Sequence, residues 1–385
     1  MMLFTSRPVG DAMATTIWGT SSSWTLTALP LFVWMGEILF RTKLSENLFK
    51  GLSPWMQKLP GGLIHVNVVG CALFAAISGS SAATVATVGK MSIPELRKRN
   101  YPEKILLGSL AGSGTLGLLI PPSIILIIYG VAVQESIAKL FIAGIIPGIM
   151  IALIFMSYVV IWSLINKKDM PKILEEYSFL EKVKRSGQLL PVILLILSVI
   201  GSIYTGIATA TEAASLGVVG ALILSYFQKS LTFDTFKSSL LGATKTSCMI
   251  AFILAGSTFL SLAMGFTGLP RNLAIWIQSM DLSPYVLILV LTIFYIILGM
   301  FLDGISAVVL TMAIIEPMIR QAGFDMIWFG IFLVIVVEMA QITPPVGFNL
   351  FVLQGMANRD MGYIAKSAVP LFLLMILAVI LVVVF

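Results

Sequence analysis

The decapeptide QITPPVGFNL, residues 341–350, lies inside an apolar stretch that is long enough to cross a lipid bilayer. Its two adjacent prolines remove two backbone N–H donors and clash with the preceding helical turn, so no continuous α-helix passes through this stretch. Carbonyl groups that lose their helical hydrogen bonds are tolerated at membrane depth only where protein buries them or where they line a cavity. The decapeptide therefore predicts a broken membrane helix beside a binding site.

The composition predicts an all-α polytopic membrane protein. Of the 385 residues, 58% are hydrophobic and only 11% are charged, and the mean hydropathy is +1.02. Apolar runs of about 20 residues recur, which is the length that a helix needs to cross a bilayer. The net charge of +6 comes without a basic face interleaved with aromatic residues, so we expect no nucleic-acid partner. Cys71 and Cys248 lack the spacing of a metal site, and we interpret them as packing residues.

The distribution of Lys and Arg sets the topology. Two apolar segments, 62–90 and 285–315, are predicted to be re-entrant hairpins that enter and leave the membrane on the same side. A full crossing at the first segment would place the basic run RKRNYPEK (97–104) outside, whereas two hairpins collect most basic residues on one face, the cytoplasm. The predicted full crossings are 17–40, 105–133, 140–166, 189–208, 211–227, 241–268, 328–356 and 363–385.

Two motifs occur once in each half of the chain. A Pro-Pro pair stands in the middle of two crossings, in GLLIPPSIILIIYG (117–130) and AQITPPVGFNLFVLQG (340–355), and G-x-S-A marks both hairpins, in ISGSSAATVATVG (77–89) and LDGISAVVLTMAI (302–314). The two hairpins open from opposite sides, so the halves are predicted to be inverted repeats. This arrangement is typical of secondary transporters, whose substrate and ion sites lie between the repeats. The first half lacks a counterpart of 211–227, which predicts that one N-terminal helix is missing.

At these motifs the sequence resembles the large membrane subunit of tripartite ATP-independent periplasmic (TRAP) transporters, the DctM type. The resemblance covers nearly the whole chain. The segments that carry it are PLFVWMGEILFRTKLSENL (30–48), GGLIHVNVVGCALFAAISGSSA (61–82), GLLIPPSIILIIYG (117–130), GMFLDGISAVVLTMAIIEP (299–317) and FGIFLVIVVEMAQITPPVGFNLFVLQG (329–355).

The resemblance implies a transporter of the bacterial inner membrane and not an enzyme. It implies sodium-driven import of an organic acid, such as a C4-dicarboxylate, sialic acid or another sugar or keto acid, with sodium as coupling ion and no cofactor. Besides membrane lipid, two protein partners are implied, a periplasmic solute-binding protein of the DctP type and a small membrane subunit of the DctQ type. It also implies an elevator-type fold similar to the ion transporter superfamily, with a core that moves against a scaffold.

The predicted division of the chain follows the two hairpins. In chain order it consists of a scaffold helix with a cytoplasmic amphipathic arm (1–61), the first half of the mobile core (62–133), scaffold helices with a central cytoplasmic loop and an outer arm (134–284), the second half of the core (285–356) and a C-terminal scaffold helix (357–385).

Sodium prefers hard oxygen ligands, among them backbone carbonyls freed where a helix breaks. The candidates are therefore the hairpin tips and the breaks that face them, and the resemblance implies two sodium sites at these positions. In the first half they are Ser78, Gly79, Ser80, Gly117, Ile120 and Pro121, and in the second half Gly304, Ser306, Thr343, Pro344 and Gly347. The alternative is that small residues here only allow close helix packing.

An anionic substrate would be held by the N-terminal ends of half-helices, with hydroxyl and amide donors from Ser81, Thr84, Ser123 and Asn349, because no Lys or Arg is predicted at membrane depth.

Two acids inside the membrane, Asp303 and Glu338, have two interpretations. Asp303 and Glu338 are candidate coupling groups, since a carboxylate inside the membrane is a functional hypothesis by default. We favour the other interpretation, in which each is a structural acceptor that caps a half-helix or bonds across the mobile core.

His65, the only histidine, permits a rival hypothesis. Together with Ser78 or Ser80 it would form the Ser–His dyad of an intramembrane serine hydrolase. The spacing is not diagnostic, no third group that would orient the histidine is evident, and a dyad leaves the second half unexplained. A passive scaffold subunit is a third class, but it needs no paired broken helices.

Overall fold

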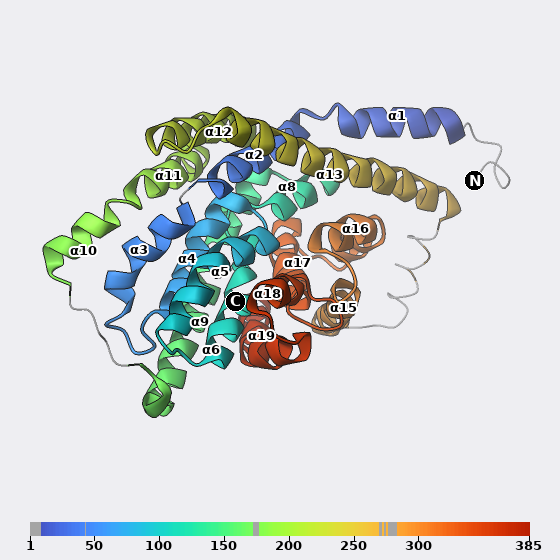
Figure 1. Cartoon of the computed structure of the whole chain (residues 1–385). Coiled ribbons are helices and arrows are strands. Elements are labelled where there is room, and N and C mark those ends of the chain that lie inside the picture. The colour runs from blue at the N-terminus through green and yellow to red at the C-terminus, as the bar shows by residue number, and fades with distance from the viewer. Residues whose placement is uncertain (1–8, 43, 172–176, 269–271, 273–274, 276–282) are drawn as a thin grey trace.

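The structure is a computed structural model, which describes residues 9–42, 44–171, 177–268, 272, 275 and 283–385 (Figure 1). Within these residues every regular element is a helix, and no strand is present. In the part of the chain that the structure describes, five helices are long and apolar enough to cross a membrane, and up to eight if each of three bent helix pairs counts as one span. The prediction of an all-α chain with many membrane-spanning helices is confirmed at this level.

One layer of the molecule contains the long helix α13 and the helices beside it (Figure 1). α2 packs on both α12 and α13, α1 lies on α13, and α11 on α12. We call these five helices the scaffold layer. Their bounds are α1 Val9–Ser21, α2 Ala28–Phe40, α11 Leu190–Tyr204, α12 Ala210–Phe227 and α13 Phe233–Thr267, with the 3-10 helix η1 Trp24–Thr27 before α2.

The prediction of one crossing over 17–40 is wrong at its start. α1 ends at Ser21 and the chain resumes at Trp24, with a bend of 50° between the two helical pieces. Three consecutive serines, 21–23, fill the gap, and Ser23 has an extended backbone (φ −64°, ψ 121°). Serine hydroxyls compete for backbone hydrogen bonds and so favour helix ends over helix interiors.

The second layer, the core layer, contains both Pro-Pro motifs and both hairpin segments. At its centre, α17 is buried on all sides, as expected of a helix that is apolar all round. The bounds are α4 Ile64–Ser78, α5 Ser81–Lys98, α6 Glu103–Gly114, α7 Leu116–Leu119, α8 Ile124–Ala132, α9 Ile137–Ile165, α15 Pro284–Gly299, α16 Gly304–Gln321, α17 Met326–Ala340, α18 Phe348–Ala357 and α19 Met361–Val384.

The sequence predicts that two of these helices, α9 and α19, belong to the scaffold. In the structure α9 packs on α4 and α17, and α19 packs on α6 and α17, so both are in contact with the core layer. Which helices move and which stay fixed remains a prediction.

The predicted cytoplasmic arm is helical, as α3 Leu44–Met56, and it packs on α4 and on α10 Phe179–Ser186. The indole N–H of Trp55 donates a hydrogen bond to the Ser186 hydroxyl at 2.6 Å. The short 3-10 helix η2 Lys167–Asp169 follows α9. The predicted outer arm, 271–284, lies almost entirely outside the described residues.

Candidate transport site

The first predicted hairpin is built from α4 and α5, and residues 78–81 form its tip, which we call the first tip. Gly79 has φ +56°, a left-handed conformation that glycine adopts without strain. The Ser80 hydroxyl accepts a hydrogen bond from the N–H of Ala83 (3.4 Å) and so caps the start of α5. The Thr84 hydroxyl donates to the Ser80 carbonyl at 2.8 Å. The tip is therefore held in shape by its own polar groups.

The first break, residues 120–123, separates α7 from α8, and the helix axis bends by 42° across it. The peptide bond between Pro121 and Pro122 is cis. The Ser123 hydroxyl caps α8 and donates a hydrogen bond to the carbonyl of Leu118. The sequence prediction of a helix broken at the Pro-Pro pair is confirmed here.

The first tip lies directly against the first break. A Cβ atom at Gly117 would lie 2.6 Å from the Cα of Ser81 and 2.7 Å from the carbonyl oxygen of Ser80. A Cβ at Gly79 would lie 3.0 Å from the carbonyl oxygen of Pro122. Only glycine lets the backbones approach this closely. The sodium candidates of the first half lie in this tip and break or next to them, while their binding of sodium remains a prediction: Ser78, Gly79, Ser80, Gly117, Ile120 and Pro121.

The second tip, residues 300–304, joins α15 to α16. The Asp303 carboxylate accepts hydrogen bonds from the N–H groups of Ile305 (3.1 Å) and Ser306 (3.2 Å). A carboxylate in this position satisfies N–H groups that have no partner within the helix and favours the positive end of the helix dipole. The geometry of Asp303 therefore fits the capping interpretation.

The second break, residues 341–347, separates α17 from α18, and its Pro-Pro peptide bond is also cis. The N–H of Val346 donates a hydrogen bond to the carbonyl of Met300 at 3.2 Å, which ties this break to the second tip. The sodium candidates of the second half lie in this tip and break or next to them: Gly304, Ser306, Thr343, Pro344 and Gly347.

Glu338 connects the two halves of the chain. It lies on α17 and is fully buried, and both of its carboxylate oxygens are 2.7 Å from the hydroxyl oxygen of Ser81 in the first tip. One hydroxyl offers a single proton, which is weak compensation for a buried negative charge. A carboxylate in this setting requires a bound cation or a proton.

Asn349, at the start of α18, is also fully buried. Neither its amide oxygen nor its amide nitrogen has a hydrogen-bond partner among the described residues. A Cβ at Gly114 would lie 3.2 Å from this nitrogen, so the side chain faces α6. An unsatisfied buried amide is costly, which makes Asn349 a candidate ligand-binding group.

Both tips open onto one cavity of about 300 Å³, the tip cavity, which α2 and α13 close from the scaffold side. No Lys or Arg is among its described lining residues. Its lining includes Gly36, Glu37, Ser78, Gly79, Ser80, Ser81, Thr246, Met249, Asp303, Gly304, Ile305 and Gln341.

Of the four predicted substrate-binding residues, only Ser81 lines the tip cavity. Thr84, Ser123 and Asn349 are fully buried behind the tips and breaks. Sequence reasoning overlooked Gln341, although it begins the quoted decapeptide, and it is buried with an unpartnered amide nitrogen.

The lining residues from the scaffold layer were also not predicted. Glu37, Thr246 and Met249 have no motif around them, and they reach the tip cavity only through the packing of α2 and α13 on the core layer.

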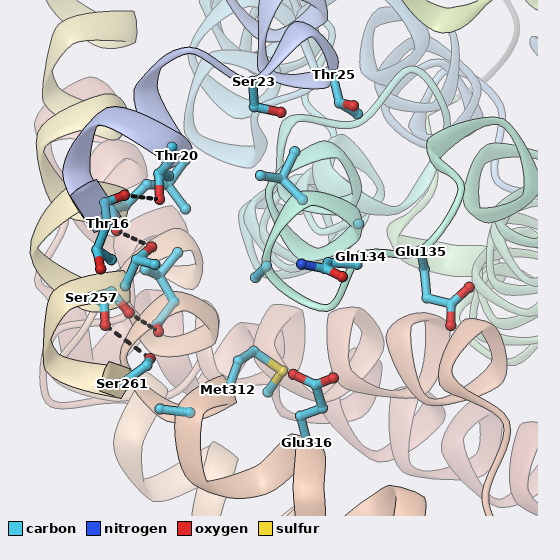
Figure 2. Close-up of a pocket in the computed structure, with 18 of the residues that line it drawn as sticks. Thr16, Thr20, Ser23, Thr25, Gln134, Glu135, Ser257, Ser261, Met312 and Glu316 are labelled. Carbon is cyan, nitrogen blue, oxygen red and sulfur yellow. Dashed lines mark hydrogen bonds between the residues drawn. The ribbon is translucent and has the colours of Figure 1, made fainter. Parts of the chain in front are cut away.

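A second, larger cavity of about 680 Å³ lies between α1, the end of α8, α13 and α16 (Figure 2). We call it the hydroxyl cavity, and no residue of either tip lines it. The hydroxyls of Thr20 and Ser261 donate to the carbonyls of Thr16 (3.0 Å) and Ser257 (2.9 Å), so they face the space mainly as acceptors. Two carboxylates, Glu135 and Glu316, also line it. Glu37 and Asp303 likewise line the tip cavity, so the carboxylates do not distinguish the two cavities, and the tip cavity is the better candidate because both tips line it.

The geometry does not support a Ser–His dyad. The Nε2 atom of His65 lies 2.7 Å from the carbonyl oxygen of Pro60. His65 is at the start of α4 and Ser78 at its end, which places them roughly 20 Å apart along a helix that rises about 1.5 Å per residue. Ser78 instead forms a hydrogen bond with Thr84 at 2.9 Å.

Comparison with known families gives a match over the entire chain. Residues 1–385 match the family described as the tripartite ATP-independent periplasmic transporter, DctM component. The chain belongs to this family. With several candidate transmembrane helices, it is a multi-pass permease of the inner membrane. The recognition made at the motifs is confirmed.

Individual relatives agree with the assignment to the DctM family. The C4-dicarboxylate TRAP transporter large permease protein DctM of Pseudomonas aeruginosa is 34% identical over 385 residues, which cover 100% of this chain and 89% of the relative. The isethionate TRAP transporter permease protein DctMQ of Oleidesulfovibrio alaskensis is 32% identical over 96% of this chain and 58% of the relative. The 2,3-diketo-L-gulonate TRAP transporter large permease protein YiaN of Escherichia coli is 30% identical over 94% of this chain and 85% of the relative.

A solved structure has a similar fold. The YdaH transporter of Alcanivorax borkumensis superposes with a TM-score of 0.67 over 97% of this chain and 87% of its own, at 13% sequence identity. This likeness concerns the fold alone.

Proposed function

We propose that this DctM-family permease imports a small organic anion together with sodium, and that the tip cavity is its binding site. The observation that carries the proposal is that both tips line one cavity, and because the carboxylates of Glu37 and Asp303 also line it, an anion there needs a cation beside it. α5 begins at Ser81 and α16 at Gly304, so two helix N-termini border this cavity, and the Asp303 carboxylate already occupies that of α16. The N–H groups and the dipole of a helix N-terminus favour a carboxylate or sulfonate.

The substrate class follows from the site and from the relatives. The relatives are named for C4-dicarboxylate, isethionate and 2,3-diketo-L-gulonate, which are all small organic anions. The tip cavity, at about 300 Å³, lies at the small end of the usual range for ligand pockets. We therefore propose a small carboxylate or sulfonate.

Sodium would offset the charge of this anion. Carbonyl groups of the two tips and breaks are the proposed ligands. We assign Glu338 a coupling role because, among the described residues, its buried carboxylate is hydrogen-bonded to the Ser81 hydroxyl alone. Asp303 is assigned a structural role as the cap of α16. Coupling requires that sodium bind the loaded permease with different free energies in its two conformations.

The conformational change is proposed to be a movement of the core layer, as inverted repeats, against the scaffold layer. α9 and α19 pack on core helices, so we propose that they move with the core. The scaffold layer approaches the first tip closely at Gly36, where a Cβ would lie 3.1 Å from the carbonyl oxygen of Ile77 and 3.3 Å from the Cα of Ser78. A glycine at this contact has no side chain that would obstruct sliding of α2 past the tip.

The proposed partners are a periplasmic solute-binding protein and a small membrane subunit. The family is the large component of a tripartite system, and in one relative the large and small parts are named together as DctMQ. The binding protein would select the substrate, because helix dipoles recognise anions without regard to the rest of the molecule.

Uptake into proteoliposomes tests this function. The chain is reconstituted with its small subunit and binding protein, and uptake of radiolabelled succinate, isethionate and 2,3-diketogulonate is measured under an inward sodium or potassium gradient. We expect uptake of at least one anion that requires both sodium and the binding protein. Equal uptake under both gradients would reject sodium coupling.

A further inference from the structure

The second arms of the two hairpins, α5 and α16, share a pattern that the motifs did not reveal. Both helices have 18 residues, with a proline at the fourteenth position and an arginine at the seventeenth: Pro94 and Arg97 in α5, Pro317 and Arg320 in α16. The two prolines are 223 positions apart in the sequence, as are the two arginines, and the same separation relates Pro121 to Pro344. The two arginines are therefore equivalent positions of the two halves.

Each arginine reaches across to the broken helix of the other half. The Nη2 atom of Arg97 donates a hydrogen bond to the carbonyl of Ala357, the last residue of α18, at 2.6 Å. The Nη2 atom of Arg320 donates to the carbonyl of Val133, which directly follows α8, at 3.1 Å. The contacts thus cross between the halves in both directions.

Both arginines are also held by carboxylates. Arg97 pairs with Glu103 at 2.5 Å, and Glu103 in turn pairs with Arg359 at 2.6 Å. Arg320 pairs with Glu316 at 2.9 Å and lies 3.8 Å from Glu135. The last carbonyls of a helix have no partner within it and carry partial negative charge. A guanidinium, with five donors in a fixed fork, can bond such a carbonyl and a carboxylate together.

We propose that Arg97 and Arg320 are equivalent positioning residues that brace each hairpin against the other half. At the tip end, each second arm contacts its own half, because the first tip touches the first break and the second tip bonds the second break. Ser81, at the tip end of α5, also bonds Glu338 of the other half. At the other end of each arm, the arginine of that arm binds the opposite half. The geometry of the tip cavity then depends on contacts at the far ends of both arms.

Hydrogen–deuterium exchange on the purified, folded chain tests this crossed arrangement without any transport assay. Replacing Arg97 by Gln should speed exchange of the last turn of α18 by about tenfold, since a hydrogen bond from a charged donor is lost. Exchange of α8 should stay unchanged. Arg320→Gln should give the reverse result: exchange should become faster at the end of α8 and stay unchanged in α18.

Matched controls are Lys98→Gln, on the same helix as Arg97, and Lys139→Gln, at the start of α9. Neither should alter exchange in α8 or α18. Arg97→Lys should give an intermediate change, because a lysine keeps the charge without the fork, and it also serves if Arg97→Gln does not fold.

Two outcomes would overturn the proposal. One is that Arg97→Gln speeds exchange in α8 and not in α18, or speeds it equally in every helix. The other is that the last turn of α18 exchanges in Arg97→Lys as fast as in Arg97→Gln, or as slowly as in the unmodified chain. The forked geometry of the guanidinium would then have no role of its own. A failure of sodium-driven uptake would leave these exchange results unaffected.

Discussion

Replacing Gly117 by Ala probes the contact between the first tip and the first break. The added Cβ would lie 2.6 Å from the Cα of Ser81 and 2.7 Å from both the Ser81 nitrogen and the Ser80 carbonyl oxygen. Ordinary van der Waals contact begins at about 3.4 Å, so the tip would have to retreat by about 0.8 Å. All three atoms belong to the backbone, and no side-chain rotation relieves the overlap.

Overpacking of this kind costs about 1–3 kcal/mol, from which the higher helix propensity of alanine subtracts up to about 1 kcal/mol. Binding constellations tolerate displacements of about 0.5 Å, so we expect sodium-dependent uptake to fall at least about tenfold while the protein still folds. Gly256→Ala is the matched control, because nothing lies within 4 Å of the position of its Cβ on α13. Thermal unfolding and proteoliposome uptake are measured for both variants.

The result that would refute this reasoning is specific. Gly117→Ala with unaltered uptake, sodium dependence and thermal stability would show that the tip does not need its present distance from the break. Equal losses in Gly117→Ala and Gly256→Ala would show that the loss comes from alanine in a membrane helix and not from the tip.

Four other variants give separable results. Ser81→Ala should raise the substrate concentration for half-maximal uptake, while Ser92→Ala, a buried hydroxyl farther along α5, should not. Glu338→Gln keeps an acceptor for Ser81 but removes the charge, so the sodium concentration for half-maximal uptake should rise by about tenfold or more. Gly304→Ala should be milder than Gly117→Ala, because the atoms nearest to its Cβ would belong to side chains and not to the backbone, the closest being Cγ1 of Val337 at 3.0 Å. His65→Ala should leave transport largely intact, and complete loss would revive a role for the histidine.

The sequence was enough to predict features that depend on local chemistry. The Pro-Pro pairs break their helices at the expected residues, and Gly79 supplies the left-handed turn at the first tip. The expected equivalence of Gly79 with Gly304 differs from the structure by two residues, because Ser81 and Gly304 are the first residues of α5 and α16. Motifs of small residues recur easily by chance, whereas the first residues of the two helices show which positions of the two halves correspond.

Features that depend on packing between distant segments could not be predicted. The Ser81–Glu338 contact joins residues 257 positions apart, and nothing near either residue specifies the other. The same holds for the hydrogen bond from Arg97 to Ala357. The packing of α9 on α17 could not be predicted either, because an apolar crossing carries little information about its neighbours.

Cysteine protection is the most direct test that the tip cavity binds the anion together with sodium. In a background with Cys71→Ala and Cys248→Ala, a single cysteine is placed by Ile305→Cys in the tip cavity or by Ser261→Cys in the hydroxyl cavity. The rate of modification by a methanethiosulfonate reagent is measured with sodium, with the transported anion, and with both. We predict that modification at position 305 slows only when both are present and that position 261 is not protected by the anion. Protection at position 261 alone, or protection at position 305 by the anion without sodium, would contradict the account.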